Sequence, residues 1–207
     1  MPEDLIEGLR RFRRDKFPRY REHYERLTAE GQHPSTLFIG CSDSRVVPEL
    51  LTGADPGQLF IIRNMGAFVP PYDPALGYHG TAATIEYAVL ALHVSEIVVC
   101  GHSHCGAVRA TYDPPNPDTP HIQRWLELGR DARVPESERG PELTEAVLRR
   151  TEQRSVTLQL KRLMTYPLVR DRVDAGALVL HGWHYFIERG EVLALDVERE
   201  AYVPIDP

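Results

Sequence analysis

Residues that bind transition metals follow two short apolar segments of the sequence. Cys41 comes directly after residues 36–40 (TLFIG), and His102 and Cys105 come shortly after residues 97–100 (IVVC). Both segments have the length and the apolar composition of buried strands. Ligands of an open parallel sheet bind beyond the carboxyl ends of its strands. If the two strands are neighbours, the three side chains share one coordination sphere.

Two cysteines and one histidine form a donor set that suits zinc. Three protein ligands leave the fourth tetrahedral position open, which is typical of catalytic rather than structural zinc sites. Cys100 lies within the second strand and is expected to point elsewhere, so no fourth cysteine closes the site. The alternative is that the cysteines are small buried hydrophobes and that the H-x-x-C spacing arose by chance.

Two other chemistries are less well supported. Ser42 and Asp43, combined with a histidine, would fit a hydrolase triad, but the G-x-S-x-G elbow of such enzymes is missing. A redox role for Cys100 and Cys105 would require a C-x-x-C motif, which is absent.

The candidate ligands need a scaffold, and short apolar segments alternate with helical patterns along the chain. Strands are expected at 36–40, 59–62, 97–100 and 178–180, helices at 81–94, 122–132 and 143–166, and a hairpin over 181–197 that turns at Arg189 and Gly190. This alternation is typical of an α/β fold with a mostly parallel central β-sheet flanked by helices. The hairpin predicts an antiparallel C-terminal edge strand.

We divide the chain into two parts. Residues 1–30 are arginine-rich and amphipathic, and they predict an N-terminal helical arm that is interrupted at Pro18. No obvious core follows the arm, so it is expected to pack on a neighbouring subunit. Residues 31–207 are expected to form a single α/β zinc-binding catalytic domain.

The composition excludes several classes of partner. A net charge of −6 gives no reason to expect nucleic acid or a membrane surface, and no apolar run approaches the ~20 residues that cross a bilayer. The N-terminal segment is too charged for a signal peptide, so we expect a cytoplasmic protein. Three cysteines, an odd number, favour a metal or catalytic role over a disulfide framework.

Several motifs together resemble the β-class carbonic anhydrases. They are CSDSR at 41–45, RN at 63–64, EYAV at 86–89, GHSHCG at 101–106 and HGW at 181–183, and the similarity extends from about Gln32 to Val203. The resemblance implies zinc-dependent, reversible hydration of carbon dioxide to bicarbonate and a proton (a carbonate dehydratase, or lyase). It implies that Cys41, His102 and Cys105 bind Zn²⁺.

The resemblance also assigns roles around the metal. Zinc-bound hydroxide is the implied nucleophile, and the Asp43–Arg45 dyad would orient it, because arginine can hold a carboxylate in bidentate geometry. Two thiolates cancel the formal charge of zinc, so we expect activity to rise on the alkaline side of neutrality. In some relatives the aspartate itself binds zinc, which Asp43 could do only by releasing Arg45.

The expected substrate-binding residues are Gln32, Phe60, Tyr87 and Gly106. The first three match the plant-type branch of the family, where such residues come partly from a second subunit, so a homodimer or higher oligomer is implied. Without the resemblance, plain core packing would be the favoured explanation for Phe60 and Tyr87. Phe38 replaces the tryptophan of the bicarbonate-regulated branch, although Arg63 and Tyr185 match two other members of its inhibitory site.

Two alternative functions remain open. Relatives on this scaffold hydrolyse carbon disulfide or carbonyl sulfide with the same three ligands. A purely structural zinc in a binding protein would make Asp43 and Arg45 dispensable except for stability.

Overall fold

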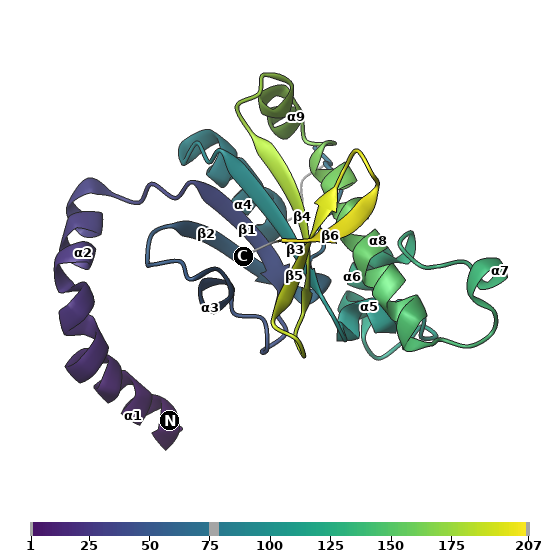
Figure 1. The fold of residues 1–207 in the computed structure, drawn as a ribbon, viewed down its shortest axis with the longest axis horizontal. Helices are drawn as coiled ribbons and strands as arrows, with labels where there is room; N and C mark the ends of the chain where they lie inside the picture. Colours follow the sequence, from purple (N-terminus) through teal and green to yellow (C-terminus); the bar gives the residue numbers. More distant parts are fainter. Residues whose placement is uncertain (1, 75–78, 206–207) are drawn as a thin grey trace.

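A computed structural model describes residues 2–74 and 79–205. Its strands form one six-stranded sheet in the order β2-β1-β3-β4-β5-β6 (Figure 1). The strands are β1 (Thr36–Cys41), β2 (Leu59–Asn64), β3 (Glu96–His102), β4 (Val179–Phe186), β5 (Glu191–Asp196) and β6 (Ala201–Pro204). The first four are parallel, and β5 and β6 continue the sheet antiparallel. The mostly parallel α/β class and the antiparallel C-terminal edge are confirmed.

The C-terminal half of the sheet differs in detail from the expectation. The segment expected at 178–180 and the first arm of the expected hairpin form one long strand, β4, which turns into β5 through residues 187–190. Gly182 lies in this strand where the helix at 145–163 packs closely, and a Cβ there would meet Val156 Cγ1 at 3.1 Å. The strand β6 was not expected, because only four residues form it.

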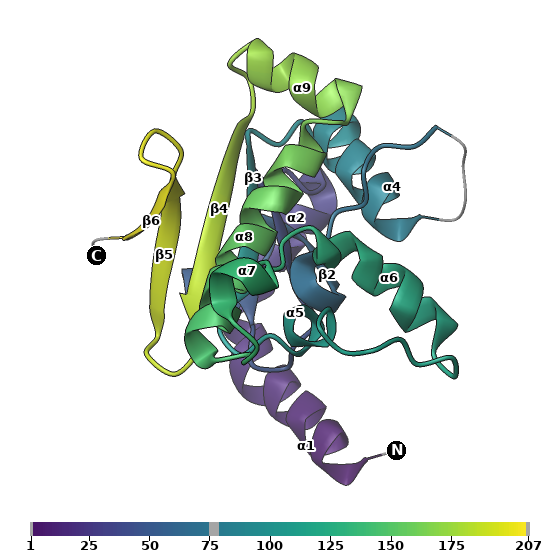
Figure 2. The ribbon, with the colours of Figure 1, turned by 90° about the vertical axis from the view of Figure 1, so that its right-hand side faces the viewer.

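Helices cover the face of the sheet that carries the main core. The longest, α8 (Glu145–Leu163), runs over β3 and β4, as Figure 2 shows. The other helical elements after the N-terminal arm are α3 (Pro48–Thr52), η2 (Met65–Ala67), α4 (Gly80–Glu86), η3 (Tyr87–Ala91), α5 (Gly106–Ala110), α6 (Pro120–Arg130), α7 (Glu136–Arg139) and α9 (Pro167–Asp174). Leu37 and Ile39 of β1 pack in the same core cluster as Val156 and Leu163 of α8. Burial of this apolar surface fixes α8 against the sheet.

The opposite face of the sheet has a smaller core. Phe38, Val98 and Cys100 are buried there and pack against Trp183. The rings of Phe38 and Trp183 lie 6.3 Å apart. Residues alternate between the two faces of a strand. Cys100 therefore points into this cluster, as expected.

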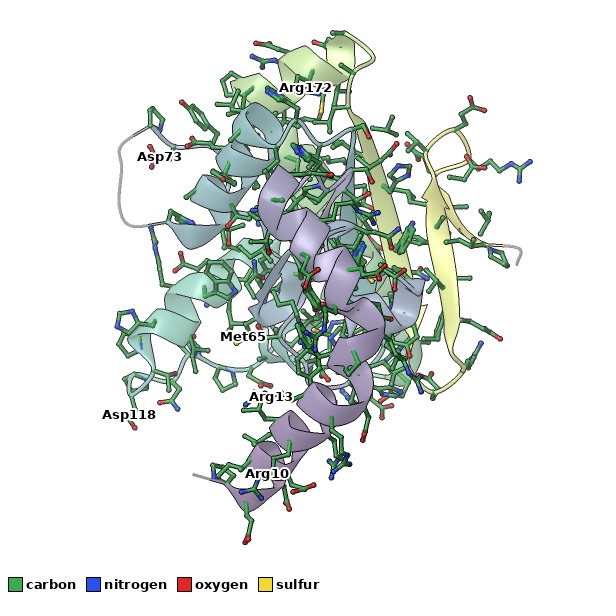
Figure 3. All side chains as sticks on the ribbon, turned by 90° about the vertical axis from the view of Figure 1, so that its left-hand side faces the viewer. Arg10, Arg13, Met65, Asp73, Asp118 and Arg172 are labelled. Atoms are coloured by element: carbon green, nitrogen blue, oxygen red, sulfur yellow. The ribbon has the colours of Figure 1, made fainter. Side chains whose placement is uncertain are left out.

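The N-terminal arm consists of α1 (Glu3–Arg11), the π-helical turn η1 (Phe12–Lys16) and α2 (Phe17–Glu30). It extends away from the sheet, and Arg10 marks its outer part in Figure 3. The expected interruption at Pro18 is absent, because the chain stays helical through the π-helical turn, which ends at Lys16, and into α2. His23 and Tyr20 anchor α2 through hydrogen bonds to the Pro56 carbonyl (2.8 Å) and to Asp55 (3.2 Å).

Within the described parts of the chain, no helix combines the length and the apolar character needed to cross a bilayer.

Candidate metal centre

The predicted ligands meet at one edge of the sheet. The sulfur atoms of Cys41 and Cys105 and a ring nitrogen of His102 all lie within 4.8 Å of one another, and all three residues are buried. The strands β1 and β3 are parallel neighbours with Gly40 opposite Cys100. The residues that follow these two positions therefore lie at the same edge of the sheet. A short turn then brings Cys105 back beside them. The juxtaposition predicted from the strand ends is present.

Backbone donors hold the Cys41 sulfur from two sides. The N–H groups of Asp43 and Gly66 each donate to its Sγ at 3.4 Å. Gly66 has a φ of 83°, and a Cβ at this position would lie 2.6 Å from the ring of Phe68. Only glycine therefore brings this N–H to the sulfur without strain.

The His102 ring is oriented for coordination. Its Nδ1 donates to the carbonyl of Ser103 at 2.8 Å, which fixes the tautomer and leaves a lone pair on Nε2. The side chain is 1% exposed, and Nε2 has no hydrogen-bond partner among the described residues. Such an orphaned buried nitrogen beside two thiols is costly unless a cation binds there. The residues therefore fit a tetrahedral divalent metal with nitrogen and sulfur ligands.

The two thiols of the cluster share a proton. The hydrogen bond from the Cys105 thiol lowers the pKa of Cys41 to about 4, against the opposing effect of burial, and nearby His102 contributes. The same hydrogen bond, together with burial, raises the pKa of Cys105. Burial raises the pKa of Cys100 to about 12. One thiolate is therefore already favoured at neutral pH before any metal binds, and it belongs to the pair rather than to Cys100.

Asp43 and Arg45 form the expected pair beside the ligands. Arg45 donates from Nε to Oδ1 at 2.9 Å and from Nη2 to Oδ2 at 2.8 Å, and its backbone N–H also donates to Oδ1 at 3.0 Å. The hydrogen bonds from Arg45 hold the pKa of Asp43 well below its usual range. Oδ2 of Asp43 lies 4.0 Å from Nε2 of His102, so the ionised carboxylate faces the cluster.

Two charged residues that the motifs did not assign to the metal centre support it. Arg63 donates from Nε to the carbonyl of Cys41 at 2.9 Å and from Nη2 to the carbonyl of Asp43. Glu152, on α8, accepts a hydrogen bond from the backbone N–H of Cys105 at 3.1 Å. Arg63 belongs to the RN motif, but the motif did not predict that its side chain would bind the backbone carbonyls of Cys41 and Asp43. No pattern marked Glu152, because a charged residue in a helix is normally expected at the surface.

The predicted substrate-binding residues occupy two regions. Gly106 directly follows a ligand, and the space where its Cβ would lie is open. Phe60 pairs in register with Leu37, four residues before Cys41 and so about 13 Å away along the strand. Tyr87 lies against Phe60 with ring centroids 5.7 Å apart, and Gln32 is exposed before β1. Within one chain, these three side chains are not brought to the metal cluster.

Comparisons with known proteins agree with this geometry. A family model described as carbonic anhydrase matches residues 36–192. A carbonic anhydrase of Pseudomonas aeruginosa is 44% identical over 203 residues, covering 98% of this chain and 91% of the relative.

Solved structures are also similar. The β-carbonic anhydrase CcaA has a TM-score of 0.91 at 41% identity, with 99% of this chain and 92% of that chain covered. One of two tetrameric β-carbonic anhydrases from Sordaria macrospora has a TM-score of 0.74 at 30% identity, with coverages of 93% and 92%.

Proposed function

The chain belongs to the β-class carbonic anhydrases, and we propose that it hydrates carbon dioxide reversibly with a zinc ion held by Cys41, His102 and Cys105. The observation that carries the proposal is the buried Nε2 of His102, which lies beside two cysteine sulfurs and has no hydrogen-bond partner in the described part of the chain. Zinc suits this mixed nitrogen and sulfur donor set. When bound, it would supply hydroxide near neutral pH by acidifying a coordinated water.

Asp43 would control the orientation of the attacking oxygen. Its pKa lies well below the usual range, so the carboxylate can only accept a hydrogen bond at neutral pH. Arg45 fixes both carboxylate oxygens and also donates to the carbonyl of His104 at 3.2 Å. Asp43 would therefore hold a donating O–H group in one orientation beside carbon dioxide. Arg63 would keep the turn that carries Asp43 in place.

Gly106 would line the substrate side of the centre. It begins α5 directly after Cys105, and open space lies where a larger side chain would project. Carbon dioxide and bicarbonate could approach here without steric conflict, and the N–H of Gly106 could help to bind bicarbonate.

We further propose that the functional unit is at least a homodimer. Gln32, Phe60 and Tyr87 lie far from the metal cluster of their own chain and would line the pocket of a second subunit. Tyr87 and Leu90 are 50% and 59% exposed on η3, which is unusual for side chains of this size. The arm also projects from its own domain and offers a further surface for a partner chain.

Two finer assignments follow the same line. The buried Phe38, packed on Trp183, supports placement in the plant-type branch, without a bicarbonate inhibitory site. The pairing of Asp43 with Arg45 supports an active state in which Asp43 does not bind the metal.

Substrate choice is tested by stopped-flow hydration of carbon dioxide beside sulfide release from carbon disulfide and carbonyl sulfide. Rapid hydration with negligible sulfide release supports the proposal. The opposite preference would assign the scaffold to sulfide hydrolysis. The hydration rate should rise on the alkaline side of neutrality, and a rate that stays flat between about pH 6 and 9 would contradict the expected acidity of the bound water.

A further inference from the structure

A buried carboxylate, that of Glu152, contacts the Cys41–His102–Cys105 cluster at Cys105. Glu152, on α8, is only 2% exposed, which is rare for a glutamate unless its charge is paired. Its Oε1 accepts the backbone N–H of Cys105 at 3.1 Å. Its Oε2 lies 3.0 Å from Nε2 of His184 and 3.0 Å from Nη1 of Arg149. The carboxylate therefore connects helix α8, strand β4 and the loop of one predicted ligand.

An arrangement of this kind is costly unless every charge is paired. Transferring a carboxylate from water into the protein interior is strongly unfavourable, and hydrogen bonds and an opposite charge must offset the cost. Arg149 supplies that charge, and its side chain is 17% exposed, whereas the side chain of His184 is fully buried. The backbone N–H of Cys105 therefore donates to a carboxylate that cannot move without breaking its contacts with Arg149 and His184.

The sequence makes room for this contact at the end of β3. A Cβ on Gly101 would lie 2.6 Å from Cγ2 of Val156, one turn further along α8 than Glu152. Because glycine lacks that Cβ, α8 can approach the strand end closely. Glu152 can then reach the Cys105 backbone, and both residues border the same small internal cavity with His102.

We propose that Glu152 is a positioning residue of the metal centre, held by Arg149 and His184. It fixes the Cys105 backbone through the N–H, and so it keeps the Cys105 sulfur directed toward Cys41 and His102. The inference rests on the proposed metal site, because it assigns a role to the support of one of its ligands. Supporting contacts of this kind typically contribute 10–100-fold to metal affinity.

The test compares zinc affinity in three variants, measured by competition with a chelator. Glu152→Ala removes the acceptor, Glu152→Gln keeps one carbonyl oxygen for the Cys105 N–H, and His184→Phe removes one partner of the carboxylate while keeping a ring beside Phe186. The matched control is Thr151→Val on the same helix. Thr151 is fully buried and hydrogen-bonds the hydroxyl of Tyr112 at 2.7 Å, away from the cluster.

We expect the zinc dissociation constant to rise about 10–100-fold in Glu152→Ala and less in Glu152→Gln, with His184→Phe between wild type and Glu152→Ala. The visible spectrum of the cobalt-substituted protein should change in the same order, because it reports the geometry of the ligands. Thr151→Val should lose stability but keep the affinity and the spectrum of the wild type.

Two results would overturn the inference. One is wild-type affinity and an unchanged cobalt spectrum in the Glu152 variants. The other is an equal loss of affinity in Thr151→Val, which would show that α8 acts only through general stability. If Glu152→Ala does not fold, the zinc affinity and the cobalt spectrum of Glu152→Gln and His184→Phe test the inference in its place. Failure of the wild type itself to bind zinc would instead contradict the proposed function.

Discussion

The carboxylate of Asp43 receives two parallel hydrogen bonds from the guanidinium of Arg45, from Nε to Oδ1 at 2.9 Å and from Nη2 to Oδ2 at 2.8 Å. This pair stands beside three buried metal-type ligands, with Oδ2 4.0 Å from Nε2 of His102. Bidentate pairing fixes the plane of the carboxylate, which lysine could not do. The carboxylate is therefore an oriented acceptor next to the metal site.

Replacing Asp43 by Asn should lower the rate of carbon dioxide hydration by about 10²–10⁴-fold while zinc content and fold are kept. Asn is nearly the same size, but its amide nitrogen is a donor and would no longer hold the attacking oxygen in one orientation. Metal analysis and stopped-flow hydration on one preparation check this. The control is Asp131→Asn, whose side chain is 78% exposed. Equal losses of fold and activity in Asp43→Asn would instead indicate a structural zinc.

Acid should weaken the contribution of Asp43 to stability. Arg45 lowers the pKa of Asp43 in the folded state, so the ionised carboxylate stabilises the fold above the ordinary titration range near pH 4, and this stabilisation is lost as the pH falls through the lower folded-state value. The difference in unfolding free energy between wild type and Asp43→Asn should shrink as the pH falls below about 5. Urea denaturation of metal-free protein measures it. A difference independent of pH would show that the ion pair does not stabilise the fold.

Metal-free protein should contain one thiolate at neutral pH. The pKa of Cys41 is lowered to about 4 by the hydrogen bond from Cys105, so thiolate absorbance in the ultraviolet should persist at neutral pH and disappear as the pH falls through about 4. Cys41→Ser should reduce this absorbance, and Cys100→Ser should keep it because burial raises the pKa of Cys100 to about 12. Absorbance that appears only above pH 8 would contradict the shared proton.

Leu90→Glu should disrupt association of two chains and reduce activity with it. Leu90 is 59% exposed on the same element as Tyr87, and a buried carboxylate at an interface is strongly unfavourable. Sedimentation velocity measures the mass and the hydration assay measures the rate. The control is Val197→Glu, which should remain at least a dimer. Val197 is 73% exposed and follows β5, near the sheet edge opposite β2, the strand whose Phe60 packs against Tyr87. A fully active Leu90→Glu monomer would refute a site shared between chains.

The sequence predicted that Cys41, His102 and Cys105 would lie together, because each follows the carboxyl end of a strand or lies in the turn after it. Parallel neighbours place such residues together by topology alone. Glu152 could not be predicted, because its burial depends on how closely α8 approaches Gly101, a tertiary contact with no periodic pattern. The distance of Phe60 from Cys41 follows from the register of β2 against β1, which the motifs do not show. Only the resemblance, which implies residues from a second subunit, anticipated this separation.

The boundaries of the strands were predicted less well than their order. The strand expected at 178–180 and the first arm of the hairpin expected over 181–197 form one strand, β4. In the arm, the π-helical turn before Pro18 keeps the chain helical where an interruption was expected. Both differences are local, and neither moves the metal ligands.

The most direct test is the zinc content of the purified protein, measured on the same preparation as its carbon dioxide hydration rate. We predict one zinc per chain with rapid hydration, and loss of both in Cys41→Ser and Cys105→Ser but not in Cys100→Ser. Two results would contradict the zinc site: a folded wild-type protein that hydrates carbon dioxide without bound metal, or a Cys41→Ser variant that keeps its zinc.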